Sequence, residues 1–378
     1  MKLPRPHSAS CAELCVRKGW DIPVRVDEFD YYLPEHLIAQ EPLPERDQSR
    51  LLVVDPVVQA IWHRKFADIV EELHPGDVLV MNDSRVLPAR LYARKSATGA
   101  QVELLLLRPS EADSHTWYAL ARPAKRLRQG TPLTLGEGED AIEIEVVAEG
   151  EEGIREIRFL TEESVIDIAN RYGEMPLPPY IHNNLEDQER YQTVYAKRVG
   201  SVAAPTAGLH FTPQLLERIG AKGVDIRHVT LHVGLGTFRP VQVETVESHH
   251  MHSEWYEVSP ETAAAVNQAK AEGRRIVAVG TTALRTLEAA GASGTLEAKQ
   301  DETDIFVYPG YKFKMIDALI TNFHLPKSTL FMLVCALIGT EFAKTVYAEA
   351  VAESYRFFSF GDAMFITRRA DVEATGNV

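Results

Sequence analysis

A change of hydrophobic pattern near residue 77, and a second change near residue 160, constrain the fold of this chain more than any other feature. Between these positions, short runs rich in Val, Leu and Ile alternate with turn residues such as Thr98-Gly99-Ala100. Runs of this length and spacing predict the strands of a small barrel or sandwich. The candidate strands are residues 77–81, 86–94, 102–108, 116–121, 132–135, 142–148 and 154–159. We therefore expect a β-barrel-like domain over residues 76–161, inserted into a larger domain.

The rest of the chain alternates strand and helix patterns. Apolar runs suited to strands occur at residues 51–54, 225–233, 275–279 and 304–307, and helical spacing occurs at 66–73, 163–172, 261–272, 282–290 and 330–338. Helices of about ten residues between short apolar strands favour βαβ units and a largely parallel sheet. We expect an α/β (α+β) fold in which residues 25–75 and 162–368 form a discontinuous α/β domain. Residues 1–24 would be an N-terminal extension, and residues 369–378 a C-terminal tail.

The net charge limits the classes of partner. The sequence has 378 residues and a formal net charge of −14. Proteins that bind nucleic acid without sequence preference usually carry a basic face, so this charge argues against bulk nucleic-acid binding. The charge is uneven, because Lys125, Arg126 and Arg128 lie close together while residues 137–156 are strongly acidic. Composition alone therefore neither supports nor excludes an RNA partner.

The cysteines and the apolar segments indicate the compartment. Cys11, Cys15 and Cys335 are too few for a disulfide framework, which suits a reducing cytosol. Residues 1–20 lack the continuous apolar run of a secretory signal. The most apolar stretch, residues 328–339, is shorter than the roughly 20 residues that a membrane span needs, and it indicates a buried helix. We expect a cytoplasmic protein with no membrane partner.

A Gly-Thr-Thr sequence follows one of the predicted strands. The run at 275–279 ends in Gly280-Thr281-Thr282, and a helical pattern begins at once. In an α/β sheet, ligands bind at such carboxyl ends, where helix N–H groups and hydroxyls face an anion or a carboxylate. Alternatively, Thr281 or Thr282 only caps the helix. Position alone leaves both interpretations open.

Two other loops have polar or flexible residues in places suited to ligands. In residues 231–240, Gly234 and Gly236 would let the backbone approach a ligand closely, although two glycines are also common in plain turns. Residues 321–329 place Asn322 and His324 just before a very apolar helix, which Ser328 or Thr329 would cap. A loop of this second kind is more often functional than structural.

Histidines are frequent in the second half of the chain: His210, His228, His232, His249, His250, His252 and His324. A metal site would use His228 with His232, or His249 and His252 with Glu254. On a strand, His228 and His232 would lie ~13 Å apart, too far for one ion. There is no Cys partner and no helical His-Glu-x-x-His pattern, so a metal site is the weaker interpretation. Histidines that move protons or bind substrate near neutral pH are favoured.

Four polar residues, 82–85, lie between two apolar runs. Asn-Asp favours a tight turn there, whereas Arg85 and Arg90 would alternatively contact phosphates or a carboxylate. Cys11 and Cys15 have a CxxxC spacing, but no third cysteine follows at CxxC distance. A radical iron–sulfur cluster is therefore not supported.

Together these segments resemble the S-adenosylmethionine:tRNA ribosyltransferase–isomerase family of queuosine biosynthesis (the QueA family). The run Pro205-Thr206-Ala207-Gly208-Leu209-His210-Phe211-Thr212 is particularly characteristic. The resemblance covers about residues 27–368, and its stretches follow in family order at 29–31, 33–34, 38–40, 44–50, 80–86, 88–90, 175–181, 189–195, 205–212, 233–240, 252–254, 280–282 and 322–328. The extension before Asp27 departs from the family pattern, which leaves the start codon and the role of Cys11 and Cys15 open.

The resemblance implies an unusual reaction in which S-adenosylmethionine is a co-substrate and no cofactor is bound permanently. The ribosyl group moves to 7-aminomethyl-7-deazaguanine at the wobble position of a tRNA with a GUN anticodon. It is isomerised there to give epoxyqueuosine, while adenine and methionine leave. Neither step requires a metal. We also expect a monomer.

Residue roles are hypotheses at this stage. His210 or His324 would move protons, with His252 as a third candidate. Thr281, Thr282 and Arg285 would hold the methionine carboxylate or another polar part of the co-substrate. Gly234, Gly236 and Phe238 would form a wall for the adenine, and Arg190 and Tyr191 would contact the deazaguanine or its phosphate. The other binding candidates are Asn82, His232, Thr237 and Asn322. An anticodon-loop contact would use Arg85, Arg90, Lys125, Arg126 and Arg128.

Three rival functions stay open. A plain S-adenosylmethionine-dependent RNA methyltransferase would leave a methylated RNA, yet the acidic residue expected after the second strand of such folds is not apparent. A non-catalytic RNA-binding module would bind tRNA and release no adenine. A metal hydrolase would lose its activity without metal.

Overall fold

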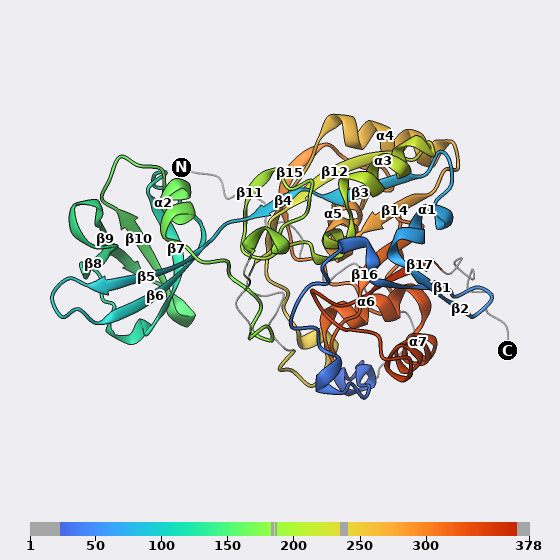
Figure 1. Ribbon diagram of the computed structural model, residues 1–378, viewed down its shortest axis with the longest axis horizontal. Coiled ribbons are helices and arrows are strands. Elements are labelled where there is room, and N and C mark those ends of the chain that lie inside the picture. Colours follow the sequence, from blue (N-terminus) through green and yellow to red (C-terminus); the bar gives the residue numbers. More distant parts are fainter. Residues whose placement is uncertain (1–22, 183–184, 186, 235–240, 369–378) are drawn as a thin grey trace, which may run out of the picture. The chain divides into compact units, whose positions relative to one another are not determined.

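The computed structural model describes residues 23–182, 185, 187–234 and 241–368. The chain divides into two compact units: one comprises residues 1–82, 206–230 and 239–378, and the other comprises residues 83–205 and 231–238. We call them the sheet unit and the barrel unit, after the β-structure that dominates each (Figure 1). The predicted extension, with Cys11 and Cys15, and the predicted tail lie almost entirely outside the described residues.

A mixed sheet of nine strands is the centre of the sheet unit in the described part of the chain. Its strands are, in spatial order, β15 (Lys299–Thr303), β13 (Glu254–Val258), β12 (Asp225–Leu231), β3 (Val78–Asn82), β14 (Ile276–Val279), β16 (Ala318–Asn322), β17 (Ala363–Thr367), β1 (Arg50–Asp55) and β2 (Ala60–Lys65). The four neighbours β12, β3, β14 and β16 are parallel. Toward the margins, β13 with β15, β16 with β17, and β1 with β2 are antiparallel.

Six helices are described in the sheet unit, of which half begin at a residue whose side chain caps them. They are α1 (Ile69–Glu72), α3 (Pro213–Ala221), α4 (Pro260–Ala271), α5 (Gly280–Ala290), α6 (Thr329–Ile338) and α7 (Thr340–Ala352). Thr212 caps α3 and Ser259 caps α4, each followed by proline at the first helical position, where its missing N–H costs nothing. Ser328 caps α6 through the Phe331 N–H, which confirms one of the two predicted caps.

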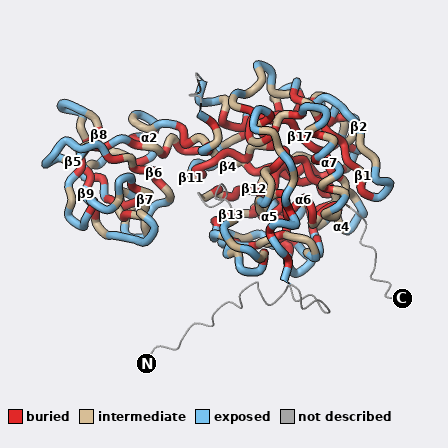
Figure 2. The backbone as a smooth tube through the Cα atoms, turned by 90° about the horizontal axis from the view of Figure 1, so that it is seen from below, coloured by how far each residue is buried: buried red, intermediate tan, exposed pale blue. Residues whose placement is uncertain are grey.

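The core of the sheet unit consists of the central strands and the helices packed on them. Along β3 and β14, every residue is buried, as expected for parallel strands that are covered on both faces. Figure 2 shows buried backbone running through the interior of the sheet unit, while exposed segments lie mainly at its periphery. α6 is buried along most of its length, as predicted.

In the barrel unit, six strands close into a barrel in the described residues: β10 (Ile154–Phe159), β7 (Thr116–Arg122), β6 (Gln101–Pro109), β5 (Arg90–Lys95), β8 (Pro132–Leu135) and β9 (Ile142–Glu149). Alternate residues face inward and pack with α2 (Val165–Tyr172) around one core, which includes Leu104, Leu133 and Ile157. A short pair, β4 (Ser84–Val86) with β11 (Arg198–Ser201), also belongs to this unit. The predicted α/β class with a barrel-like domain is confirmed.

Several local predictions were wrong. Residues 78–82 form β3 of the large sheet rather than a barrel strand, and residues 304–307 follow β15 instead of forming a strand. The sheet is mixed rather than largely parallel, since its outer strands reverse direction. The remaining domain boundaries stay predictions.

Membrane spanning was tested on the described helices. None of them alone has the length and apolarity of a span, and α6 with α7 reaches that threshold only as a pair bent by 114°.

Candidate functional site

Three parallel strands end side by side at one edge of the sheet. β3 ends at Asn82 and β16 ends at Asn322, while β14 lies between them and leads into Gly280. The Asn82 amide nitrogen Nδ2 donates to Thr282 Oγ1 over 3.1 Å, which joins the first strand end to the helix after the second. Carboxyl ends of neighbouring parallel strands are where such sheets bind ligands. We call Asn82, Thr281, Thr282, Asn322 and His210 the carboxyl-edge site.

Helix α5 begins in the carboxyl-edge site without a side-chain cap. Its N-cap residue is Val279, whose side chain offers no acceptor, and Thr281 and Thr282 lie inside the helix. The interpretation that one of these threonines caps α5 is therefore wrong. Gly280 has φ +84°, and a Cβ there would lie 3.6 Å from the Ala207 Cβ. The positive end of the helix dipole, with its first-turn N–H groups, is therefore available to a negative group.

His210 lies buried at the end of the short 3-10 segment Thr206–His210, and both of its ring nitrogens have partners. Nδ1 lies 2.7 Å from Ser49 Oγ, and Nε2 lies 3.1 Å from Asn322 Nδ2. The Asn322 amide is held in turn, because Oδ1 accepts from the Thr206 hydroxyl over 3.2 Å. His210 thus connects the edge of the sheet to the segment before β1.

The protein environment selects the tautomer of His210. Asn322 Nδ2 also lies 3.4 Å from the Asp362 carbonyl oxygen, and a flipped amide would place two acceptors face to face there. In the observed orientation, Asn322 donates to His210 Nε2, so this nitrogen carries the lone pair. The ring proton is then on Nδ1 and points to Ser49 Oγ. His210 can take a proton from a substrate only if Asn322 moves away.

Burial keeps His210 neutral. Burial first, and then the positive charges of Arg356 and Arg46, lower the pKa of His210 from 6.5 to about 3. Its ring stacks on Phe66 with 4.8 Å between the ring centroids, so the environment on that side is apolar. Arg46 is held nearby, since its guanidinium donates to the Leu209 carbonyl over 3.1 Å.

His324 follows β16 and is also buried, but it is held differently. Its Nε2 lies 2.9 Å from Thr321 Oγ1, and its backbone N–H donates to the Tyr347 hydroxyl over 3.2 Å. The Tyr31 hydroxyl donates to its carbonyl oxygen. Burial lowers the pKa of His324 from 6.5 to about 3. The backbone of His324 is therefore fixed at both polar groups, while its ring makes one hydrogen bond within the described part of the chain, to Thr321 in strand β16.

Arg285 is engaged with a carboxylate of the protein. Its Nη1 forms a buried ion pair with Glu254 Oε2, and its Nε donates to the Ile305 carbonyl over 3.3 Å. Its third nitrogen, Nη2, is buried and has no hydrogen-bond partner in the described part of the chain. A buried cation with one unused donor is suited to a further acceptor.

The histidines near Glu254 do not converge with it. His252 is exposed, whereas Glu254 is buried against Arg285. His249 packs edge-on against Phe306 with 5.4 Å between the ring centroids. Across residues 23–182, 185, 187–234 and 241–368, no group of three His, Cys, Asp or Glu side chains is placed to hold a metal ion.

The predicted binding residues of the barrel unit are mostly engaged within it. Arg85 Nη2 pairs with Glu189 over 2.5 Å, and Arg90 Nε lies 3.3 Å from Glu103. Tyr191 is fully buried, so its ring belongs to the core in this structure.

Other predicted binding residues lie next to the undescribed part of the chain. His232 packs so closely over Gly200 that a Cβ at Gly200 would lie 2.7 Å from His232 Nε2. Arg190 and Gly234 are partly buried. The rest of the predicted adenine wall, Gly236 and Phe238, lies outside the described residues, as does the binding candidate Thr237.

Sequence reasoning missed the residues that hold the site together. Ser49 and Phe66 contact His210, and Thr206 holds Asn322. Ser49 and Thr206 both lie inside stretches that resemble the family, so the motifs pointed to them without giving a role. Phe66 had no signal beyond an apolar position at the start of a helical pattern.

Comparison with known proteins agrees with this architecture. The family model described as queuosine biosynthesis protein matches residues 26–366. This chain is similar to the S-adenosylmethionine tRNA ribosyltransferase from Thermotoga maritima, of which a crystal structure is known. The two sequences are 41% identical, the match covers 90% of this chain and 99% of that chain, and the TM-score is 0.51. The resemblance seen in the motifs is confirmed. The chain therefore belongs to the queuosine biosynthesis protein family.

Proposed function

We propose that this protein transfers the ribosyl group of S-adenosylmethionine to 7-aminomethyl-7-deazaguanine in tRNA and isomerises it. The products are epoxyqueuosine in tRNA, adenine and methionine. Membership of the queuosine biosynthesis family supports this proposal, as does the 41% identity to a ribosyltransferase over nearly the whole of both chains. The acceptor tRNA carries a GUN anticodon, and the enzyme acts as a monomer in the cytoplasm, with S-adenosylmethionine as co-substrate.

The chemistry needs a base and a group that stabilises a leaving purine. The sulfonium of S-adenosylmethionine acidifies the protons on the ribose 5′ carbon, so a positioned base forms an ylide. Departure of adenine then needs protonation or charge stabilisation at the purine. We propose that neutral side chains and a helix end meet both demands at the carboxyl-edge site and at His324, which follows β16.

The single observation that carries the assignment of the site is the uncapped start of α5 beside the Asn82–Thr282 hydrogen bond. We propose that the methionine carboxylate binds there, at the positive end of the helix, with the hydroxyl of Thr281 as a further donor. The unused Nη2 of Arg285 is a second donor of the same helix. Gly234, Gly236 and Phe238 stay our candidates for the wall of the adenine, and Thr237 stays a binding candidate.

For proton transfer we propose His324 before His210. The ring of His324 makes one hydrogen bond, to Thr321, whereas both nitrogens of His210 are occupied by Ser49 and Asn322. Both histidines are neutral at physiological pH, so His324 has a lone pair for a substrate proton. We assign His210 to positioning Asn322. The exposed His252 stays a third candidate.

The decisive experiment is incubation of the purified protein with S-adenosylmethionine and tRNA that carries the aminomethyl-deazaguanine. Free adenine and the mass of the digested nucleoside are measured. Adenine release that depends on this tRNA, with the mass gain of an epoxycyclopentanediol, supports the proposal. Transfer of a labelled methyl group to the tRNA would instead indicate a methyltransferase. Binding of tRNA by a folded protein without adenine release would indicate a binding module.

A further inference from the structure

Positive charge gathers on the segment that leaves strand β7 of the barrel. Residues 122–128, which we call the basic loop, include the exposed side chains of Arg122, Lys125, Arg126 and Arg128. Arg128 pairs with Glu149 over 3.1 Å. Within the described residues, no carboxylate pairs with Arg122, Lys125 or Arg126. Three uncompensated cations on one short loop are unexpected in a chain with a net charge of −14.

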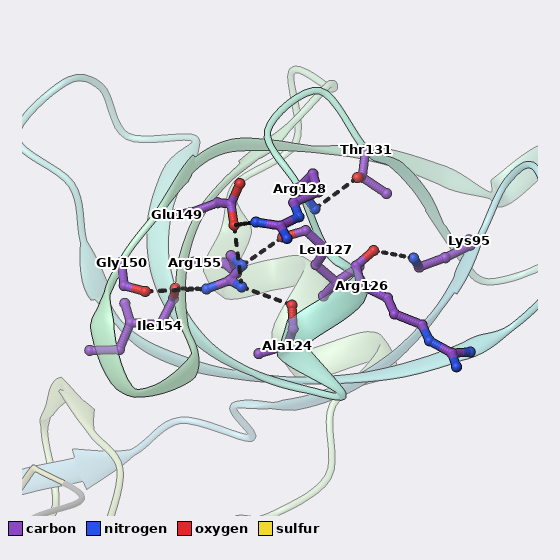
Figure 3. Close-up of polar contacts among 10 residues, drawn as sticks. All are labelled: Lys95, Ala124, Arg126, Leu127, Arg128, Thr131, Glu149, Gly150, Ile154 and Arg155. Atoms are coloured by element: carbon purple, nitrogen blue, oxygen red, sulfur yellow. Dashed lines mark hydrogen bonds and ion pairs between the residues drawn. The ribbon is translucent and has the colours of Figure 1, made fainter.

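The backbone of the basic loop is held from below by a buried arginine. The Arg155 side chain is 7% exposed and extends under the loop (Figure 3). Its Nε donates to the Leu127 carbonyl over 2.7 Å, and its Nη2 donates to the Ala124 carbonyl over 2.8 Å. Its Nη1 donates to the carbonyls of Ile154, over 2.6 Å, and Gly150, over 3.3 Å. One guanidinium therefore ties the loop to strand β10 and to the turn before it.

Other contacts fix the same segment. Leu127 is fully buried in the barrel core, the Arg128 N–H donates to Thr131 Oγ1 over 3.1 Å, and the Lys95 amine donates to the Arg126 carbonyl. Because the backbone polar groups point inward to these partners, the cationic side chains are left on the solvent side. Because the loop is already ordered in the folded protein, the entropy cost of ordering its backbone does not reduce the affinity for a ligand that binds later.

Neighbouring arginines of the barrel unit behave differently. Arg94 pairs with Glu137 over 3.4 Å, and Arg158 pairs with Asp113 over 3.0 Å. On an acidic protein, cations outside a binding surface are readily neutralised in this way. A fixed loop with unpaired cations is instead suited to a polyanion, whose phosphates each take one charge.

We propose that the basic loop binds the phosphate backbone of the substrate tRNA, with Arg122, Lys125 and Arg126 as the phosphate contacts and Arg155 as their positioning residue. The proposal rests on the proposed function, which identifies the RNA as tRNA. It explains how an acidic enzyme holds a polyanionic substrate, and it draws only on contacts within the barrel unit.

The test is the salt dependence of tRNA binding by the full-length triple variant R122Q/K125Q/R126Q. Unmodified and aminomethyl-deazaguanine tRNA are titrated by fluorescence anisotropy over a series of salt concentrations. Each lost phosphate contact lowers the slope of log affinity against log salt by about 0.7 to 0.9, so the slope is expected to fall by about 2. Affinity near physiological salt should fall roughly tenfold or more.

The matched control is R108Q. Arg108 is also exposed on the barrel, but it lies opposite Tyr118 on β7, four residues before Arg122, and its guanidinium stacks 4.4 Å from the centroid of the Tyr118 ring. We expect R108Q to keep the slope of the unchanged protein. Equal slopes and affinities for the triple variant and R108Q would overturn the proposal.

Adenine release separates this inference from the proposed function. In the triple variant, the KM for tRNA should be higher than in the unchanged protein, while the KM for S-adenosylmethionine should be the same. Suppose that the unchanged protein releases no adenine, yet the triple variant has a smaller salt slope for tRNA binding than the unchanged protein. The proposed reaction is then wrong, and the proposed binding surface is supported. If adenine release and tRNA affinity are both unaffected in the triple variant, the reaction stands and the surface is wrong.

Discussion

His210 shows how one amide decides what an imidazole can do. Asn322 occupies the lone pair of its Nε2, and Ser49 takes the proton on Nδ1. Because both ring nitrogens have hydrogen-bond partners within the protein, the ring orients Asn322 at the end of β16 and has no lone pair available for a substrate proton. A histidine in a family motif is therefore not a base by default, since the second hydrogen bond sets its role.

Acid should destabilise the protein through His210 and His324. Each has a folded pKa of about 3 against 6.5 for an ordinary histidine. Below pH 6.5 the unfolded chain binds protons that the folded chain does not, so stability is lost as the pH falls from 6.5 toward 3. The loss is roughly 1.4 kcal/mol per pH unit for each histidine. Urea unfolding at several pH values measures it.

His210→Asn provides the control for this pH dependence. Removing one of the two titrating groups should reduce the pH slope by about one proton, whatever it does to the stability at neutral pH. A slope that does not change in the variant would mean that His210 titrates normally in the folded protein.

Replacing His324 should affect turnover more than binding. We expect His324→Gln to lower kcat by about 100-fold or more, with little change in the KM for S-adenosylmethionine, because a general base acts in the transition state. Adenine release under saturating substrates measures kcat. An unchanged kcat in this variant would show that His324 is not the general base. The same assay on His252→Gln would then test the remaining candidate.

The sequence predicted the residues of the site better than their contacts. Asn82 and Thr282 were named because they follow predicted strands, and Asn322 because it precedes a very apolar helix; the sheet brings all three to one edge. The pairing of Asn322 with His210 depends on how residues 206–210 pack against β16, which no local pattern encodes. The burial of Tyr191 was missed for the same reason, since an aromatic side chain suits a core as well as a base.

At the scale of elements, the start of α5 is the junction on which the site depends. The turn from β14 into α5 needs a left-handed residue at Gly280, and the uncapped helix start that follows is the proposed carboxylate site. Geometry that glycine adopts with little strain therefore aims the helix dipole at the proposed carboxylate site.

Gly280→Ala tests this junction against Gly273→Ala. Both glycines have positive φ, of 84° and 68°, but Gly273 follows α4 and a Cβ there would meet nothing within 4 Å. Each variant should lose about 1 to 2 kcal/mol of stability from backbone strain. Only Gly280→Ala should also raise the KM for S-adenosylmethionine. Equal KM values for S-adenosylmethionine in the two variants would show that the start of α5 does not bind the co-substrate.

Element type followed from the sequence more readily than strand direction did. β12, α4, β14 and α5 were predicted because alternation of short apolar runs with helical spacing is a local signal, whereas β13 was missed. That β17 runs antiparallel to β16 was not predictable, because direction is set by the path of α6 and α7 between them. β3 resembled a barrel strand because a fully apolar run carries no mark of which sheet it joins.

Across the whole molecule, each unit has its own buried arginine. Arg285 pairs with Glu254 in the sheet unit, and Arg155 bonds four backbone carbonyls in the barrel unit. Since each arginine lies within a separate core, a substitution that removes its contacts should mainly lower the stability of the unit that contains it.

Calorimetry of Glu254→Gln and Arg155→Met tests whether the units unfold separately. Removing one partner of a buried ion pair costs about 3 to 5 kcal/mol, so Glu254→Gln should lower the melting temperature of the sheet unit alone. Arg155→Met should lower that of the barrel unit alone, because four carbonyls lose the guanidinium as a donor. A single transition that both variants shift together would show that the two units melt as one.

The order of strands in the large sheet also has a consequence for synthesis on the ribosome. Strand β1, which ends at Asp55, pairs with the adjacent strand β2 and with β17, which begins only at Ala363 and ends at Thr367. The barrel strands, by contrast, are contiguous from Arg90 to Phe159. The barrel can therefore fold while the ribosome is still extending the chain, whereas the side of β1 that faces β17 stays unpaired until residue 367 has been made. During that interval the hairpin of β1 and β2 has an apolar edge to which a chaperone can bind.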